Sequence, residues 1–193
     1  MEHNVEIRRL LDIMPASGRM MTKIVSKPAQ TKVIDSDFPL PFTKYRPIYI
    51  NFDLWIKLTK PQRDLTLLHQ VSWLISIKWL QPNINQGIVI LGLLGGIFET
   101  TQLDIVGIAV SGGLTALAAA RIWQNNKSQN SLLNADLDAV KIAQRRGYSE
   151  AEAAENLLTA ITTIAQIEGR SGLEFSELLR IQNLQAIANL HNQ

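Results

Sequence analysis

An almost uncharged middle segment constrains this chain more than any other feature. Two apolar stretches, "GIVILGLLGGIF" (residues 87–98) and "IVGIAVSGGLTALAAA" (residues 105–120), are separated by the short link "ETTQLD". Each stretch alone is shorter than the roughly 20 apolar residues that usually cross a bilayer. With its flanking residues included, each comes close to that length. We therefore predict an apolar helical hairpin over residues 86–123.

Small residues recur within both stretches. Gly92 and Gly96 are four residues apart in the first, and Gly112, Ala116 and Ala120 keep the same spacing in the second. Small side chains at this spacing let two helices approach closely in lipid. We therefore expect the hairpin to insert into a membrane. A hairpin buried inside a soluble helical protein is the alternative, because its helices would also be apolar on every side.

Charge is unevenly distributed around this segment. Residues 1–86 contain twelve Lys and Arg against seven Asp and Glu, whereas Glu99 and Asp104 are the only charged residues of 87–120. A basic front half next to an apolar middle suits an anionic lipid surface, and the positive-inside rule predicts that both termini are cytoplasmic. We expect the basic residues near the start to contact lipid headgroups as a group. These residues are Arg8, Arg9, Arg19, Lys23, Lys27 and Lys32.

Composition also excludes several kinds of site. The chain has no cysteine, which rules out disulfides, thiolate metal sites and a cysteine nucleophile. Its histidines are His3, His69 and His191, too few and too scattered for a site built from several imidazoles. The sequence has no recognised nucleic-acid-binding motif or dense basic cluster, so we do not expect a nucleic-acid partner.

Periodicity and turn residues predict a mainly helical chain with a short strand region, an α+β fold. Helices are expected over residues 4–14, 59–79, 131–147, 149–169 and 175–190, a strand over 45–52, and a wandering extended segment over 20–46. Thr59 with Gln62, and Ser149 with Glu152, have the spacing of capping boxes. We divide the chain into a basic N-terminal segment (1–46), a strand and histidine-bearing helix (47–80), the hairpin (86–123) and a C-terminal helical region (131–193).

The helix over residues 59–79 places one histidine among leucines, in "LLHQVSWL". In the zinc-peptidase helix H-E-x-x-H, two histidines one turn apart bind the metal and the glutamate activates water. In the same frame this chain has His69, Gln70 and Trp73. A glutamine amide cannot take a proton from water, and an indole nitrogen only donates. The helix therefore keeps one ligand and loses the base and the second ligand.

The order of the motifs resembles the membrane zinc metallopeptidases of the HtpX and prenyl-protein protease type. "TKPQRDLTLLHQVSWL" is similar to the metal-binding helix of that family, "LLNADLDAV" to its second motif, and "RRGYSEAEAAENLL" to the helices that follow. The resemblance implies a degenerate metallopeptidase-like helical frame. It also places Leu132 at the third ligand position, four residues before Asp136. With two ligands and the base replaced, we predict no catalytic residue, no metal site and no cofactor.

The remaining polar residues of these motifs have structural expectations. His69 is expected to be a packed, hydrogen-bonded side chain at the edge of an apolar helix face. Asp136 and Asp138 are expected to be surface or capping groups, and the resemblance leaves open that Asp136 anchors a neighbouring helix.

Nearly the whole chain is similar to a family of uncharacterised cyanobacterial proteins. "MEHNVEIRRLLDIMPASGRM", "INFDLW", "PQRDL", "VSWL" and "AQRRGY" carry this similarity. It implies a photosynthetic bacterium as the source, and a thylakoid or plasma membrane as the location.

These observations predict a catalytically inactive, membrane-associated protein that scaffolds or assembles another membrane protein, with a photosynthetic context implied by the resemblance. The expected partners are membrane lipid and that second protein. Two alternatives stay open. One is an active membrane zinc peptidase with an unconventional centre, made of His69 with Asp136, Asp138 or Glu99. The other is a soluble helical regulatory protein.

Overall fold

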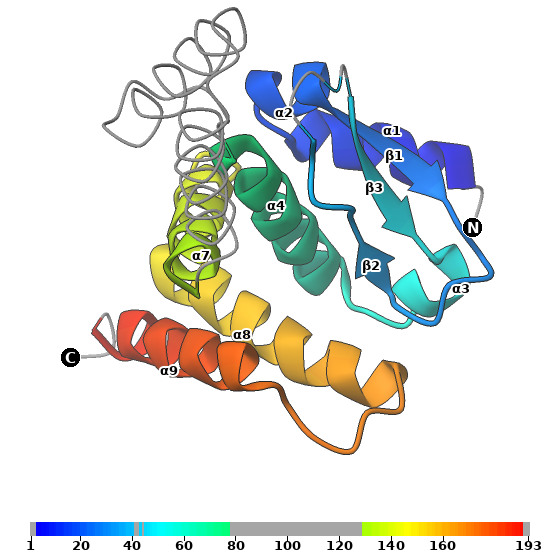
Figure 1. Cartoon of the computed structure of the whole chain (residues 1–193). Coiled ribbons are helices and arrows are strands. Elements are labelled where there is room, and N and C mark those ends of the chain that lie inside the picture. Colours follow the sequence, from blue (N-terminus) through cyan, green and yellow to red (C-terminus); the bar gives the residue numbers. More distant parts are fainter. Residues whose placement is uncertain (1–2, 41–42, 44, 78–128, 191–193) are drawn as a thin grey trace, which may run out of the picture. The chain divides into compact units, whose positions relative to one another are not determined.

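The computed structural model describes residues 3–40, 43, 45–77 and 129–190, and the described parts of 1–77 and 129–193 form one compact unit. The apolar hairpin predicted over 86–123, with Glu99 in it, lies outside these residues. Figure 1 labels the elements, which are α1 (His3–Ile13), α2 (Ala16–Met21), β1 (Thr22–Ser26), β2 (Ile34–Asp35), β3 (Arg46–Ile50), α3 (Phe52–Trp55), α4 (Lys60–Ser76), α7 (Gln129–Gln144), α8 (Glu150–Ile167) and α9 (Phe175–Leu190).

The strands form a three-stranded sheet in the order β1-β3-β2. β1 runs parallel to β3, with Thr22 opposite Arg46, and β2 runs antiparallel to β3, with Ile34 opposite Ile50. The strand predicted over 45–52 is therefore confirmed as β3. The prediction of an irregular segment over 20–46 was wrong for β1 and β2. The prolines that suggested irregular structure there stand outside both strands, and β1 itself contains β-branched residues that favour a sheet.

Two hydrophobic cores lie on opposite sides of α4. In Figure 1, the sheet and α1 lie on one side of this helix, and α7, α8 and α9 lie toward the other. The first core joins α1, the sheet and α3 to Leu67, Val71 and Leu74 of α4. The second joins α7, α8 and α9 to Leu65 and Leu68 of the same helix. The helix α4 thus packs against both cores, and this explains why polar side chains on it are also buried.

The helix ends follow the sequence closely. Thr59 and Ser149 each accept a hydrogen bond from the backbone N–H three residues later, and the Gln62 and Glu152 side chains complete the capping boxes. α7 and α8 are followed by Gly147 and Gly169, whose φ angles of 98° and 68° suit glycine. The predicted helices over 4–14, 59–79, 131–147, 149–169 and 175–190 are all present to within a few residues, as far as the described residues extend.

The mainly helical α+β fold class is confirmed. Within the described ranges, none of the helices combines the length and the apolar character needed to cross a bilayer.

Candidate functional site

His69 lies in the middle of α4, at the junction of α4, α7 and α9. Its side chain is 9% exposed, and its Nδ1 lies 2.6 Å from Asp136 Oδ1, although the N–H bond does not point straight at that oxygen. The expectation of a packed histidine is therefore met, with a carboxylate as its neighbour.

Asp136 is fully buried, so the expectation of a surface or capping group was wrong for this residue. Arg180 of α9 binds both of its oxygens, with Nε 2.8 Å from Oδ2 and Nη2 2.8 Å from Oδ1. A buried carboxylate needs this compensation because burial of an unpaired charge is costly. Asp136 thus anchors a neighbouring helix, which the peptidase resemblance had left open. Asp138 behaves as expected, since it is exposed and lies 4.0 Å from Lys141.

Burial and the neighbouring charges shift the pKa values of His69 and Asp136. Burial lowers the pKa of His69, and the nearby Arg180 lowers it further against the opposing effect of Asp136. Burial alone would raise the pKa of Asp136, but the adjacent His69 and Arg180 more than offset it, so its pKa lies below the ordinary value. The arrangement at neutral pH is therefore a neutral imidazole beside an Arg–Asp ion pair.

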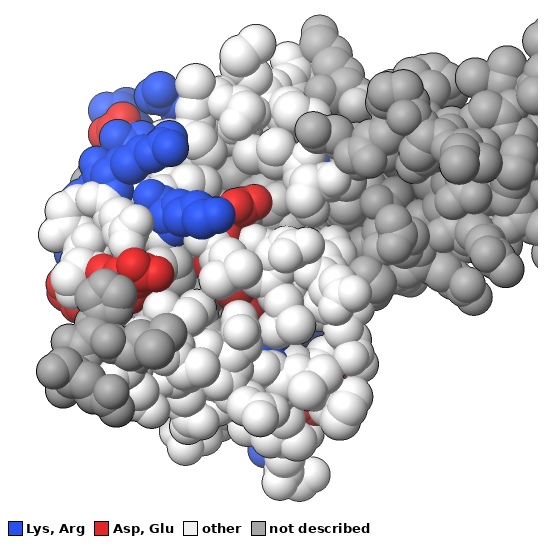
Figure 2. All heavy atoms as spheres, turned by 90° about the vertical axis from the view of Figure 1, so that its left-hand side faces the viewer, with Lys and Arg blue, Asp and Glu red and all other residues white. Residues whose placement is uncertain are grey.

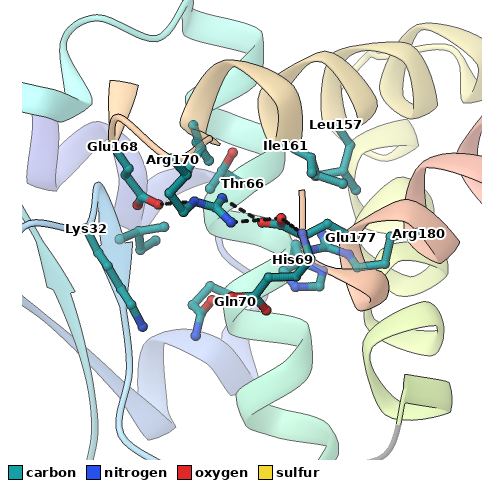
Figure 3. Close-up of a pocket in the computed structure, with 13 residues that line it drawn as sticks. Lys32, Thr66, His69, Gln70, Leu157, Ile161, Glu168, Arg170, Glu177 and Arg180 are labelled. Carbon is teal, nitrogen blue, oxygen red and sulfur yellow. Dashed lines mark hydrogen bonds and ion pairs between the residues drawn. The ribbon is translucent and has the colours of Figure 1, made fainter. Parts of the chain in front are cut away.

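His69 also faces a pocket of about 250 Å³, shown in Figure 3. Its walls come from α4, from α8, from the start of α9 and from the sheet edge near β2. The lining residues are Lys32, Ile34, Thr66, His69, Gln70, Leu157, Ile161, Ile164, Glu168, Arg170, Glu174, Glu177 and Arg180.

Ion pairs organise the upper wall of this pocket as it appears in Figure 3. Arg170 lies between two carboxylates, with its Nη atoms 2.7 and 2.8 Å from the Glu177 oxygens and its Nε 3.0 Å from Glu168. Glu168 also accepts a hydrogen bond from the Val33 N–H at 2.8 Å, which ties α8 to the segment before β2. The charges of this wall are therefore paired, with one guanidinium shared by two carboxylates and one net negative charge left over.

The residues at the altered peptidase positions have structural roles. Gln70 donates a hydrogen bond to Ser36 Oγ at 2.9 Å. The Trp73 ring meets the Phe38 ring edge-on, with 6.3 Å between centroids. Leu132 is half-buried on α7. In the part of the chain that the structure describes, no three His, Cys, Asp or Glu side chains lie together in a way that could hold a metal ion.

A second buried polar cluster fastens the N-terminal helix. Glu6 of α1 is 2% exposed and accepts hydrogen bonds from Arg9, Arg63 and the Trp55 indole. Arg9 also pairs with Asp64 of α4. Arg9 therefore forms ion pairs within the protein while its side chain stays 25% exposed, and its contact with lipid headgroups stays a prediction.

Arg180 is the site residue that the sequence analysis missed. It lies 44 residues from Asp136, in a helix where nothing in the local pattern distinguishes it from a solvated arginine. An unpaired acid in the apolar run of α7 was the available signal that some cation had to lie opposite.

Comparison with known proteins gives one match. A search of the curated proteins finds no match, and neither does a search of the solved structures. The family model described as "Protein of unknown function (DUF3318)" matches residues 8–148, well over half of the 193 residues, and this range includes His69 and Asp136. The expectation of an uncharacterised family is confirmed: the chain belongs to the DUF3318 family of proteins of unknown function.

Proposed function

We propose that this protein is membrane-associated, metallopeptidase-like and catalytically inactive. It binds another membrane protein as a scaffold or assembly factor. The similarity to cyanobacterial proteins suggests photosynthetic complexes as the setting. Membrane lipid and a partner protein are the proposed contacts.

The main support for catalytic inactivity is that the Asp136 carboxylate already has protein partners. Arg180 binds both carboxylate oxygens, and the same carboxylate lies 2.6 Å from His69 Nδ1. A catalytic zinc site needs about three protein ligands and an open position for water. A metal ion approaching His69 on this side would meet a fixed guanidinium and would have to displace it, which favours a structural role for the histidine.

The membrane contact is supported by the exposed basic residues near the start of the chain. Arg8, Arg19 and Lys23 are exposed. Lys27 lies over the Tyr49 ring, 4.6 Å from its centroid, and Lys32 pairs with Asp35 at 3.1 Å. Figure 2 presents the face on the left of Figure 1, away from α1, α2 and β1, the elements of Arg8, Arg19 and Lys23, so it is not the face of these three residues. On it, Lys and Arg gather toward one edge beside acidic side chains, and much of the remaining described surface is uncharged.

Hydrolysis is tested on the purified full-length protein. We expect no stoichiometric zinc by mass spectrometry of metals, and no cleavage of unfolded casein with or without added zinc. One tightly bound zinc, together with cleavage that is lost with a chelator and in His69→Ala, would overturn the proposal in favour of the peptidase built on His69 with Asp136, Asp138 or Glu99.

Lipid contact is tested by flotation with phosphatidylcholine vesicles, prepared with and without phosphatidylglycerol. The triple variant Arg8→Gln, Arg19→Gln and Lys23→Gln should bind the anionic vesicles at least about tenfold more weakly than the wild type, since each basic residue near a charged surface contributes on the order of 1 kcal/mol.

The matched control for lipid contact removes the same charge elsewhere. Lys57, Lys60 and Lys141 are also exposed, and their replacement by Gln should leave binding unchanged. Equal losses in the two triple variants would mean that net charge, not this segment, drives the contact.

Partner binding is tested in native membranes by crosslinking and affinity capture. The protein should resist carbonate extraction and should capture the same membrane protein repeatedly. Release by carbonate would instead favour the soluble regulatory protein.

A further inference from the structure

We infer that the pocket beside His69 binds a neutral hydrogen-bond donor, a primary carboxamide or a hydroxyl group carried on a short apolar group. The inference rests on the part of the proposed function that leaves His69 without a metal ion. It does not depend on the membrane role.

The His69 ring has one hydrogen-bond acceptor to spare. A carboxylate oxygen only accepts hydrogen bonds, so the Nδ1 atom 2.6 Å from Asp136 must carry the hydrogen. In the neutral ring the other nitrogen, Nε2, is then an acceptor. Among the described residues Nε2 has no hydrogen-bond partner, and the side chain lines the pocket. A ligand group that donates a hydrogen bond would complete it.

The hydroxyl of Thr66, one helical turn before His69, also lacks a partner in the described part of the chain. Thr66 lines the same pocket and is 6% exposed. The Thr162 and Thr163 hydroxyls of α8 differ, because both donate to the Thr159 carbonyl of their own helix. A buried hydroxyl without a partner is unfavourable. Its Oγ1 is itself closed off, so a turn of the Thr66 side chain about χ1 would be needed for a ligand with both donor and acceptor atoms to reach it and remove that cost.

Most of the charged side chains around the pocket are already paired. Arg180 is paired with Asp136, Arg170 with Glu168 and Glu177, and Lys32 with Asp35. Glu174, the remaining charged residue of the lining, is exposed to solvent. An anionic ligand would have to compete with these carboxylates for a cation, and a cationic ligand at His69 would lie near the like charge of Arg180. A neutral ligand leaves the pairs intact.

The size and apolar part of the pocket define the rest of the ligand. Leu157, Ile161 and Ile164 supply an apolar wall from α8, and Ile34 adds to it from β2. A volume of about 250 Å³ is slightly below the usual range for drug-sized ligands. It suits a carboxamide or hydroxyl on a branched group of a few carbons.

The test titrates chelator-treated, ¹⁵N-labelled full-length protein with isobutyramide. The readout is the ¹⁵N chemical shift of His69 Nε2 in long-range ¹H–¹⁵N spectra, assigned with His69→Gln. Isobutyrate and isobutylamine have the same skeleton with a charge and serve as matched ligands. We expect saturable shifts with isobutyramide at about millimolar concentration, as for small fragments, and none with the charged pair. No shift with isobutyramide, or equal shifts with all three, would overturn the inference.

Variants locate the binding. Thr66→Val should weaken isobutyramide binding about tenfold through the lost hydrogen bond. Thr66→Ser keeps the hydroxyl and should bind like the wild type, so a loss in both variants would argue for a packing effect and against the inference. Thr162→Val is the matched control on α8, outside the pocket, and should change nothing. If Thr66→Val does not fold, Thr66→Ala against Thr66→Ser gives the same comparison.

A final comparison distinguishes a free small molecule from the side chain of a partner protein. Isobutyramide is compared with a blocked Ala-Gln-Ala peptide, which carries the same carboxamide on a backbone. Tighter binding of the peptide would identify a partner side chain as the source, and weaker binding a free small molecule. Zinc bound at His69 in the metal assay would contradict the proposed function. Failure of isobutyramide to bind the metal-free protein would contradict only this inference.

Discussion

At the residue scale, the carboxylate of Asp136 controls how three helices meet. It lies on α7, contacts His69 of α4 and receives both hydrogen bonds of Arg180 from α9. A charge with no exposed surface is stable only when its partners are in place. The sequence analysis identified His69 and Asp136 but attached no importance to Arg180, because a residue's partner in another helix is not part of its local pattern.

Removal of Arg180 should therefore cost far more than removal of a surface arginine. Arg180→Met leaves Asp136 buried without its cation, and we expect the free energy of unfolding to fall by about 3–5 kcal/mol. Urea unfolding followed by far-UV circular dichroism measures the change. Arg145→Met, an exposed arginine beyond the end of α7, is the matched control and should have no measurable effect. Equal stabilities of the two variants would mean that the buried pair is not formed.

His69 should make the protein less stable in mild acid. Burial lowers its pKa, so below about pH 6.5 the unfolded chain takes up a proton that the folded chain refuses, and stability falls as the pH falls. The slope between pH 7 and pH 5 is at most about 1.4 kcal/mol per pH unit. The pKa values of Glu6, Asp136 and Glu177 are also lowered in the folded protein. The stability that these carboxylates add to the fold is lost only at more acidic pH.

The contribution of His69 to the pH dependence of the free energy of unfolding is measured by unfolding the wild type and His69→Gln in urea at pH 8, 7, 6 and 5. The variant should have a flatter profile between pH 7 and pH 5. A profile for His69→Gln that matches the wild type would assign the dependence to other groups.

At the element scale, the start of α4 was predicted well, but how much of its surface is buried was not. Its start after the Thr59 cap agrees with the sequence, and Leu65, Leu68, Val71 and Leu74 are all buried. The sequence pattern suggested one buried face, whereas the helix serves two cores. A helix enclosed on both sides has no clear amphipathic stripe, so periodicity alone understates how much of it is buried.

The short helix α2 was not predicted, and its contact with α4 gives a direct test. A Cβ atom added at Gly18 would lie 2.7 Å from Val71 Cγ1, closer than such atoms approach in proteins. Gly18→Ala should lower the free energy of unfolding by about 1–3 kcal/mol, as expected for overpacking. Thermal or urea unfolding measures the loss.

The control and the rescue for Gly18 are available in the same chain. Gly172→Ala places its Cβ in open space and should be neutral or slightly stabilising. In the double variant Gly18→Ala with Val71→Ala, the cost should be smaller than the sum of the two single costs, since the second change makes room for the first. Additive costs would show that Gly18 is not limited by Val71.

At the scale of the whole molecule, distant parts of the sequence are held together by buried polar clusters. Glu6 near the start contacts Trp55 and Arg63, and Asp64 links Arg9 to the Tyr148 hydroxyl, 2.9 Å away, beside the turn between α7 and α8. Burial and the hydrogen bond to Asp64 raise the pKa of Tyr148 to about 12. These contacts join α1 to α4 and to the segment that follows α7.

Loss of the Glu6 charge should loosen this attachment. Glu6→Gln weakens the hydrogen bonds from Arg9 and Arg63, and we expect a loss of about 2–3 kcal/mol in the free energy of unfolding. Hydrogen exchange should increase first in α1. Glu155→Gln, an exposed acid on α8, is the matched control. Unchanged exchange in α1 would mean that apolar contacts alone hold this helix.

The sequence by itself determined the longer helices α1, α4, α7, α8 and α9, the caps at Thr59 and Ser149, the β3 strand and the residues replaced at the peptidase positions. These follow from local chemistry: a capping hydroxyl and a glycine with positive φ act within a few residues of chain. Only the tertiary structure decided that Arg180 neutralises Asp136, that Arg9 lies in an internal ion pair and that Thr66 shares a pocket with His69. Those outcomes depend on which helices become neighbours, and burial then converts an ordinary charge or hydroxyl into a group that must find a partner.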